Sequence, residues 1–520
     1  MTAVTTPPAY DTPALDIYDN VWDSIRHWVE TAPDLPAIDQ DGTVWSYGRL
    51  GQAVEILTDF LTAHEVASGD RVLFVMENSV GAIAGMLAAM RLGAWAIPLN
   101  ARLSVREIDE IRNHAGPRVT LYTTGVSKDA LAHAERHGAR EAPSLQGVGL
   151  LYAPADTVAH RMPAFGPPRD RVAALIYTSG TTGNPKGVML THGNLLFIAG
   201  RSSQARLTTP ADKVYAVLPI SHVFGLASVF LGNMYRGAQL KLVSRFVPAE
   251  AARSLAEDGI TTFHGVPAMF SHLVSLAANS GQPIRAPKLR YMSVGGAPLD
   301  LSLKQRVEAM FGVPLNNGYG LTESAPTVCM TMIGDKRTDD TVGTLLDGVE
   351  VRMVDPASGK EVPPGGIGEM WVKGGLVMKG YFRDPLRTAE VLTPDHWLKT
   401  GDLARMEPDG SLYIVGRLKE LIIRSGFNVY PSEVEGVITS HPDVAMAVVV
   451  GRSRDGNEEV VAFVQPIPGR SVTAEALDEF VSDRLAPYKH PTQYLIRDTL
   501  PATPTGKILR HQLQQEAIGL

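Results

Sequence analysis

The chain has 520 residues, of which 44% are hydrophobic and 20% are charged, and this composition excludes a disordered or fibrous protein. At roughly 100–200 residues per domain, its length predicts about three domains or subdomains. The formal net charge of −7 makes nucleic acid an unfavourable partner, and the one cysteine, Cys329, excludes an intramolecular disulfide framework.

We expect neither a secretory signal nor a membrane span. The N-terminus has no basic segment followed by an apolar core. The most apolar run, residues 80–99, is interrupted by Arg91, Gly93 and Pro98, which favours a buried helix followed by a strand. With a single cysteine, these features predict a cytoplasmic protein.

Helical and strand patterns alternate along most of the chain. Helical spacing marks residues 21–33 and 48–66, and short apolar runs predict strands at 71–76, 95–100, 118–123 and 172–178. This alternation predicts a buried, largely parallel sheet with helical crossovers. Residues 138–170 are rich in Pro, Gly and Ala, which indicates a surface connection.

The pattern changes in the last third of the chain. Alternating runs at 349–355 and 368–374, separated by Pro and Gly, predict a mostly antiparallel β subdomain over about 342–415. A new α/β unit then begins, with helices expected at 432–440 and 473–485 and strands at 444–451 and 459–466. We therefore expect a domain boundary near residues 417–420.

A loop rich in glycine and hydroxyl groups follows the strand predicted at 172–178. Its glycines let the backbone approach a ligand closely, and its hydroxyl and backbone N–H groups can bind phosphate oxygens. The loop lacks the Walker pattern and the dinucleotide fingerprint. The candidate phosphate-binding residues are Thr178, Ser179, Gly180, Thr181, Thr182, Gly183 and Lys186.

The segment YTSGTTGNPKG resembles the signature loop of the adenylate-forming superfamily, which includes acyl-CoA synthetases, nonribosomal-peptide adenylation domains and luciferases. Further motifs recur in the family's order over nearly the whole chain. The resemblance implies an α/β protein. Its large N-terminal domain, residues 1–417, would contain doubly wound α/β subdomains and the β subdomain. A hinge at 418–420 and a small mobile C-terminal α+β domain at 421–520 would follow.

The same resemblance implies an ATP site. Tyr319 would present its ring to the adenine, Thr322 would hydrogen-bond the α-phosphate, and Glu323 would bind Mg²⁺. Asp402 would accept hydrogen bonds from the ribose hydroxyls, and Arg417 would reach the ribose or a phosphate. The other residues implied at the nucleotide are Gly296, Ala297, Pro298, Asn317, Gly318 and Gly320.

Three further roles follow from the resemblance. Lys507 would stabilise charge as the acyl oxygen attacks phosphorus, with Thr322 and His222 also at the reaction centre. Lys419 matches the position of the hinge. Ser425, Gly426 and Phe427 would line a tunnel for CoA.

The implied acyl pocket is apolar, and His222 is a wall or gate at its edge. Its other residues are Val223, Phe224, Gly265, Val266, Met269, Gly295, Gly320, Leu321 and Ala325. Members of the superfamily that load amino acids usually carry an aspartate directly after this gate to hold the ammonium group. Here the run Val223–Leu226 contains no acidic residue, which disfavours an α-amino acid. A fatty, alicyclic or aromatic acid fits, and the residues do not rank these three classes.

The resemblance therefore implies a ligase of the fatty-acid or aryl-CoA branch. It would use ATP and Mg²⁺ to form an acyl-adenylate and then transfer the acyl group to CoA. An amide synthetase of the same fold, with an amine as acceptor, stays open as an alternative. A non-catalytic nucleotide sensor is disfavoured because Lys507, Glu323 and Asp402 are all present. Both a monomer and a homodimer remain possible.

Overall fold

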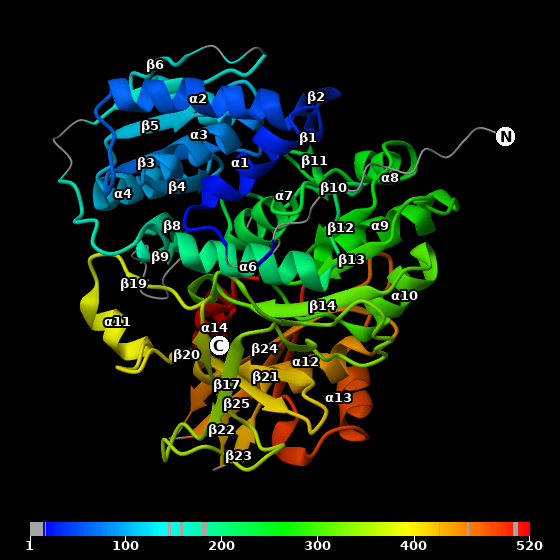
Figure 1. Ribbon diagram of the computed structural model, residues 1–520. Helices are drawn as coiled ribbons and strands as arrows, with labels where there is room; N and C mark the ends of the chain where they lie inside the picture. Colours follow the sequence, from blue (N-terminus) through cyan, green and yellow to red (C-terminus); the bar gives the residue numbers. More distant parts are fainter. Residues whose placement is uncertain are drawn as a thin grey trace.

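The computed structural model describes residues 14–15, 17–143, 145, 147–155, 160–178, 186–425, 427–454, 457–502 and 508–520 (Figure 1). These residues form a mixed α/β structure with a large N-terminal domain and a smaller C-terminal domain, which confirms the predicted fold class.

The first N-terminal sheet is built on parallel strands whose residues are almost all buried. Every residue of β3 is buried, as a continuous apolar run in a central parallel strand requires. Antiparallel strands extend both sides of this centre. In spatial order the strands are β19 (Gly380–Tyr381), β9 (Lys186–Thr191), β8 (Val172–Thr178), β4 (Trp95–Asn100), β3 (Arg71–Met76), β5 (Val119–Tyr122), β7 (Leu151–Pro154) and β6 (Arg140–Glu141).

Strands β6 and β7 lie within residues 138–170, which we predicted to be a surface connection. The prediction is wrong for these strands, because β7 pairs with β5 from Leu151 to Pro154. Four residues are too few to carry a clear alternating pattern, so the neighbouring strand decides the conformation.

The second N-terminal sheet is parallel from β1 through β14 and antiparallel at its two ends. In spatial order it contains β16 (Thr344–Leu345), β15 (Thr327–Met330), β14 (Leu315–Gly320), β13 (Tyr291–Val294), β12 (Thr262–Gly265), β10 (Lys213–Ala216), β11 (Gln239–Leu242), β1 (Pro36–Gln40) and β2 (Thr43–Ser46).

Helices form three layers around these two sheets. One buried core joins both sheets to α1 (Val21–Thr31), α2 (Tyr47–Ala63), α3 (Val80–Arg91) and α6 (His192–Ala205). The opposite face of the first sheet carries α4 (Val105–Ala115) and α5 (Lys128–Arg136). The opposite face of the second sheet carries α8 (Pro248–Glu257), α9 (Pro267–Ser280) and α10 (Leu301–Phe311). A π-helix, Phe224–Leu231, leads directly into α7 (Gly232–Met234).

The first part of the apolar run at residues 80–99 forms a buried helix, α3, as predicted. Residues Val80 to Met90 of α3 are all buried. A Cβ on Gly85 would lie 2.7 Å from Cε1 of Phe74, so the small residue lets the helix pack closely on β3. Across the part of the chain that the structure describes, no helix combines the length and the apolar character needed to cross a membrane.

A four-stranded antiparallel sheet leads to the C-terminal domain (Figure 1). It contains β17 (Val349–Val354), β18 (Gly368–Gly374), β20 (Leu398–Met406) and β21 (Leu412–Arg417), with α11 (Pro385–Val391) before β20. A 3₁₀ turn, Leu418–Glu420, follows directly. Ser432, at the start of α12, donates a hydrogen bond to the Val415 carbonyl, so the C-terminal domain lies against β21.

The C-terminal domain has its own core on both faces of a small sheet. Helices α12 (Pro431–Thr439) and α13 (Ala474–Ser482) cover one face, and α14 (Arg510–Ile518) covers the other. The sheet contains β24 (Val444–Arg454), β25 (Asn457–Pro466) and β26 (Gln493–Ile496), and a hairpin of β22 (Ile422–Arg424) and β23 (Phe427–Val429) precedes α12.

Candidate active site

Strands β8 and β9 form a hairpin that carries the predicted phosphate loop. Thr178 pairs with Lys186 at the loop end of this hairpin, and Tyr177 pairs with Gly187. A Cβ on Gly187 would lie 2.9 Å from Cδ1 of Leu175, so glycine allows the two strands to meet there. The predicted loop residues Ser179, Gly180, Thr181, Thr182 and Gly183 lie outside the described residues.

The second nucleotide motif forms the end of β14 and the 3₁₀ turn Thr322–Ser324. Gly320 is required here, because a Cβ would lie 1.7 Å from the carbonyl oxygen of Pro326. The turn presents Glu323 half-buried and Thr322 buried. The motif therefore ends beside β15, with its polar side chains directly after the carboxyl end of a parallel strand, where ligands of α/β folds bind.

Tyr319 and Asp402 come together from β14 and β20. The Tyr319 hydroxyl donates a hydrogen bond to Oδ2 of Asp402, and Nε of Arg417 lies 3.1 Å from Oδ1 of the same carboxylate. Asp402 is only 3% exposed. Burial raises the pKa of Asp402, and the Arg417 guanidinium opposes that rise. Three residues predicted at the nucleotide thus form one contact group.

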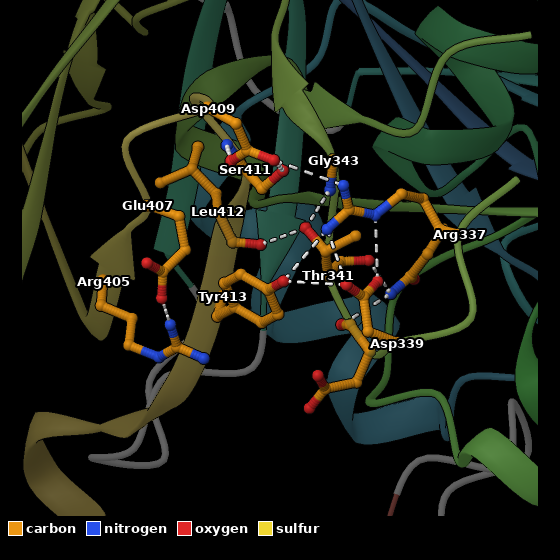
Figure 2. Close-up of polar contacts among 12 residues, drawn as sticks. Arg337, Asp339, Thr341, Gly343, Arg405, Glu407, Asp409, Ser411, Leu412 and Tyr413 are labelled. Carbon is orange, nitrogen blue, oxygen red and sulfur yellow. Dashed lines mark hydrogen bonds and ion pairs between the residues drawn. The ribbon is translucent and has the colours of Figure 1, made fainter. Parts of the chain in front are cut away.

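Asn317 holds the backbone of a neighbouring segment. Its Nδ2 donates to the Thr341 carbonyl at 3.0 Å, and its Oδ1 accepts the Gly318 N–H at 3.0 Å. Thr341 donates through Oγ1 to the Leu412 carbonyl of β21 at 2.8 Å (Figure 2). The amide of Asn317 thus links the nucleotide motif through Thr341 to the antiparallel sheet, and its predicted contact with nucleotide stays a prediction.

An ion-pair network also connects the segment that follows β15 to β21 and to the turn before it (Figure 2). Asp339 accepts hydrogen bonds from Nη2 of Arg337 at 2.6 Å and from the Tyr413 hydroxyl at 2.9 Å. Arg337 also lies 3.4 Å from Asp409, in the turn between β20 and β21. These contacts fix β21 against the chain that follows β15, and they involve none of the predicted site residues.

The predicted acyl residues divide into exposed, half-buried and core positions. His222 is exposed and accepts the Phe224 N–H through Nδ1 at 3.3 Å. A Cβ on Gly295 would lie 3.4 Å from Cε1 of Phe224, so the two predicted residues border one another. The half-buried side chains are Phe224, Val266, Met269 and Leu321, and each packs on the central core, as the half-buried Tyr319 does.

Four predicted acyl residues, Val223, Gly265, Gly295 and Ala325, are buried. Val223 is 1% exposed and Ala325 is 0% exposed, so both side chains belong to the core itself. Gly265 is also buried, and a Cβ there would lie 2.9 Å from Cε2 of Phe270. By contrast Gly296, Ala297 and Pro298 are exposed directly after β13.

Tyr381 contacts both nucleotide motifs, and we did not predict it from the sequence. Its hydroxyl donates to Oε1 of Glu323 at 2.7 Å, and its ring centroid lies 5.3 Å from Nζ of Lys186. A lone Gly-Tyr pair after a loop carries no pattern that indicates this role. Only the pairing of β19 with β9 brings Tyr381 beside the phosphate hairpin.

The donor set at Glu323 suits magnesium bound together with a phosphate ligand. Mg²⁺ takes oxygen ligands and is usually held by one or two carboxylates plus substrate phosphates. Among the described residues no cluster of three His, Cys, Asp or Glu side chains could hold a metal by itself. Glu323 is a single carboxylate beside the phosphate hairpin, which fits a magnesium ion held jointly by one carboxylate and the phosphates of the substrate.

The 3₁₀ turn at the predicted hinge is tied to both domains. Arg417, before the turn, pairs with Asp402 of the N-terminal domain. Glu420, at its end, lies 3.1 Å from Nε of Arg510 on α14. Lys419 lies exposed between these two ion pairs.

The predicted CoA residues lie at the β22–β23 hairpin. Ser425 has φ 52°, and its N–H donates to Oδ1 of Asn457 at 2.7 Å. Phe427 is 55% exposed and stacks on Tyr488 with ring centroids 4.7 Å apart. Gly426 and the predicted catalytic Lys507 lie outside the described residues.

Comparisons with known proteins agree over most of the chain. The family model "AMP-binding enzyme" matches residues 25–382, and the model "AMP-binding enzyme C-terminal domain" matches residues 433–507. A feruloyl-CoA synthase of Amycolatopsis sp is 33% identical over 491 residues, which cover 93% of this chain and 96% of that protein. 4-Coumarate–CoA ligase 5 of Oryza sativa subsp. japonica is 32% identical over 490 residues, covering 91% and 89%.

A solved structure shares the fold over nearly its full length. ATP-bound MatB from Rhodopseudomonas palustris has a TM-score of 0.83 at 28% identity, covering 96% of this chain and 99% of that chain. The apo form of the same protein has a TM-score of 0.74 at 29% identity with the same coverage. The chain thus resembles the ATP-bound form more closely than the apo form.

Proposed function

This chain belongs to the AMP-binding enzymes of the adenylate-forming superfamily and is an AMP-forming acyl-CoA ligase, and from that premise we propose that its acyl substrate is a hydrophobic aromatic monocarboxylic acid. The observation that carries the proposal is that the predicted acyl residues Phe224, Val266, Met269 and Leu321 are apolar and half-buried on the central core. Two of the relatives are named for the aromatic acids ferulate and 4-coumarate, which supports the aryl class.

The first half-reaction joins the acid to AMP. A carboxylate oxygen attacks the α-phosphorus of ATP. The bond between the α-phosphorus and the oxygen that bridges it to the β-phosphate breaks, and pyrophosphate leaves with that oxygen. In our proposal Lys507 and Thr322 stabilise the charge that develops at the α-phosphate. Thr178, Lys186 and the loop between them bind the outer phosphates. When bound at Glu323, Mg²⁺ neutralises phosphate charge.

The nucleoside would be held by the contact group of Tyr319, Asp402 and Arg417. The Asp402 carboxylate can accept hydrogen bonds from two ribose hydroxyls while it still accepts one from Tyr319. That bond fixes the Tyr319 ring, whose face is available to the adenine. Exposed Gly296, Ala297 and Pro298 would border the base.

The second half-reaction transfers the acyl group to sulfur. The thiol of CoA loses its proton as sulfur attacks the acyl carbon, and AMP leaves. We propose that the pantetheine arm passes the hairpin turn at Ser425, Gly426 and Phe427, with Lys419 as the hinge that brings this turn to the adenylate. Exposed His222 would stand at the entrance to the acyl site as a gate. The single, buried Cys329 suits an enzyme of the reducing cytoplasm.

A substrate panel tests the aromatic assignment. Cinnamic and benzoic acids, linear acids of six to twelve carbons and cyclohexane carboxylic acid would be compared through pyrophosphate release and through loss of the free CoA thiol. We expect kcat/KM to be at least about tenfold higher for the best aromatic acid, roughly the effect of one or two methylene groups in an apolar pocket. Equal or higher values for a linear or alicyclic acid would contradict the proposal.

A further inference from the structure

Tyr381 is a buried side chain whose two ends contact the two nucleotide motifs. It is 6% exposed. Its ring faces Nζ of Lys186 at 5.3 Å, and its hydroxyl lies 2.7 Å from Oε1 of Glu323. One rigid side chain therefore contacts the lysine of the phosphate hairpin and the proposed magnesium carboxylate together.

The backbone around Tyr381 is anchored to the same two motifs. Met378 donates its N–H to the Glu323 carbonyl at 2.9 Å, and Phe382 donates its N–H to the Gly187 carbonyl at 2.8 Å. We call residues 378–382 the strap. The strap that carries Tyr381 is therefore hydrogen-bonded to both motifs at its two ends.

The chemistry of these contacts keeps two opposite charges available. If Lys186 and Glu323 paired with each other, the ammonium would be turned from the phosphates and the carboxylate from the cation. No ion pair joins these two described residues. The aromatic face of Tyr381 attracts the Lys186 ammonium but carries no formal negative charge that would neutralise it. The Tyr381 hydroxyl donates to only one of the two oxygens of Glu323, so the other oxygen is left for the cation.

We propose that Tyr381 is a positioning residue for adenylation, which holds Lys186 and Glu323 in the arrangement that binds ATP with its magnesium ion and prevents them from pairing. This inference rests on the assignment of Glu323 to magnesium in the proposed function. In this proposal Tyr381 acts through Lys186 and Glu323 and contacts neither ATP nor the carboxylic acid.

Tyr381→Phe tests the hydroxyl, because the ring over Lys186 is kept. Calorimetric ATP binding would be measured with Mg²⁺ and with EDTA. We expect affinity to fall about tenfold in Mg²⁺, as for loss of a hydrogen bond to a charged group, and to stay unchanged in EDTA. Consumption of supplied acyl-adenylate by CoA should not change. Tyr413→Phe is the matched control, since it removes the tyrosine hydroxyl that bonds Asp339 and should leave ATP binding as in the wild type.

Replacement by 4-aminophenylalanine should restore magnesium-dependent binding, because its N–H can donate to Glu323. This variant also keeps the test decisive if Tyr381→Phe does not fold. Tyr381→Leu removes the ring as well and should weaken ATP binding in EDTA too. In a Glu323→Gln background, Tyr381→Phe should add no further loss.

The outcomes separate this proposal from the magnesium assignment. If Glu323→Gln leaves the magnesium dependence of ATP binding unchanged, the assignment of Glu323 is wrong, and this inference falls with it. If Glu323→Gln abolishes that dependence while Tyr381→Phe binds as the wild type does, only the role of Tyr381 is overturned.

Discussion

Asp402 shows how one buried carboxylate joins residues that are far apart in the chain. Its two oxygens contact Tyr319 from β14 and Arg417 from the end of β21. Burial favours the neutral acid, whereas the guanidinium favours the carboxylate that a ribose diol requires. Each residue could be identified from its motif, but their mutual contacts could not, because β14 and β20 belong to different sheets.

Arg417→Met tests this balance at the residue scale. Without the guanidinium the pKa of Asp402 should rise further, so the acid limb of the pH profile of kcat/KM for ATP should move to higher pH. Because the folded-state pKa is raised, the stability from this group is greatest below the unfolded value and is lost as pH rises through the folded value. The variant should therefore lose stability at neutral pH, by at most about 1 kcal/mol for a half-exposed arginine, and less in acid.

Kinetic pH profiles and thermal melting at several pH values would measure both effects. Arg405→Met is the matched control, since Arg405 lies on the same strand as Asp402 but pairs with Glu407 (Figure 2). An unshifted acid limb in the Arg417 variant would show that this arginine does not govern the ionisation of Asp402.

At the scale of elements, the 3₁₀ turn Leu418–Glu420 joins two anchored ends. Arg417 is held by the N-terminal domain and Glu420 by Arg510 of α14. Arg510 is itself paired with Glu435 at 2.7 Å, which secures it to α12. A change in backbone angles at Lys419 can therefore rotate one domain against the other while both ion pairs stay formed.

Lys419→Pro should lock the present orientation, because proline fixes φ near roughly −65°, a value that a 3₁₀ turn accepts. This chain is more similar to the ATP-bound than to the apo form of MatB. We therefore expect the variant to fold, keep adenylate formation and lose most of the transfer to CoA. Stopped-flow assays of the separate half-reactions would measure this, with Lys419→Ala as a control that keeps both. Wild-type rates for both half-reactions in the proline variant would contradict the hinge placement.

At the scale of the whole molecule, sequence patterns predicted the central strands well but did not predict which motif residues would be buried or which contacts distant segments would make. Strands β3, β4 and β8 begin and end where the apolar runs predicted, because a strand buried on both faces must be continuously apolar. The core positions of Val223 and Ala325 could not be predicted, since an apolar residue in a motif can face a ligand or a second layer. Tyr381 was missed because its contacts depend on how a two-residue strand docks.

Lys507→Ala tests the division of labour between the domains. The lysine is proposed to act only on the phosphoryl displacement, so adenylate formation should fall by about 10²–10³ in rate, as for loss of one charge-stabilising contact. Use of a supplied acyl-adenylate by CoA should stay near the wild-type rate. Separate assays of pyrophosphate release and thioester formation would measure the two steps, with Lys489→Ala as a control in the same domain. Equal loss in both steps would overturn the assignment.

The strap also sets the order in which the enzyme becomes competent during its synthesis. The phosphate hairpin leaves the ribosome early, and the turn that carries Glu323 follows much later. The residues that bridge them, Met378 and Phe382, emerge later still. A nascent chain that ends before residue 378 has both nucleotide motifs but neither of the strap's hydrogen bonds to them. Because domains fold as units as they emerge, ATP can meet a complete site only after the N-terminal domain is almost entirely made.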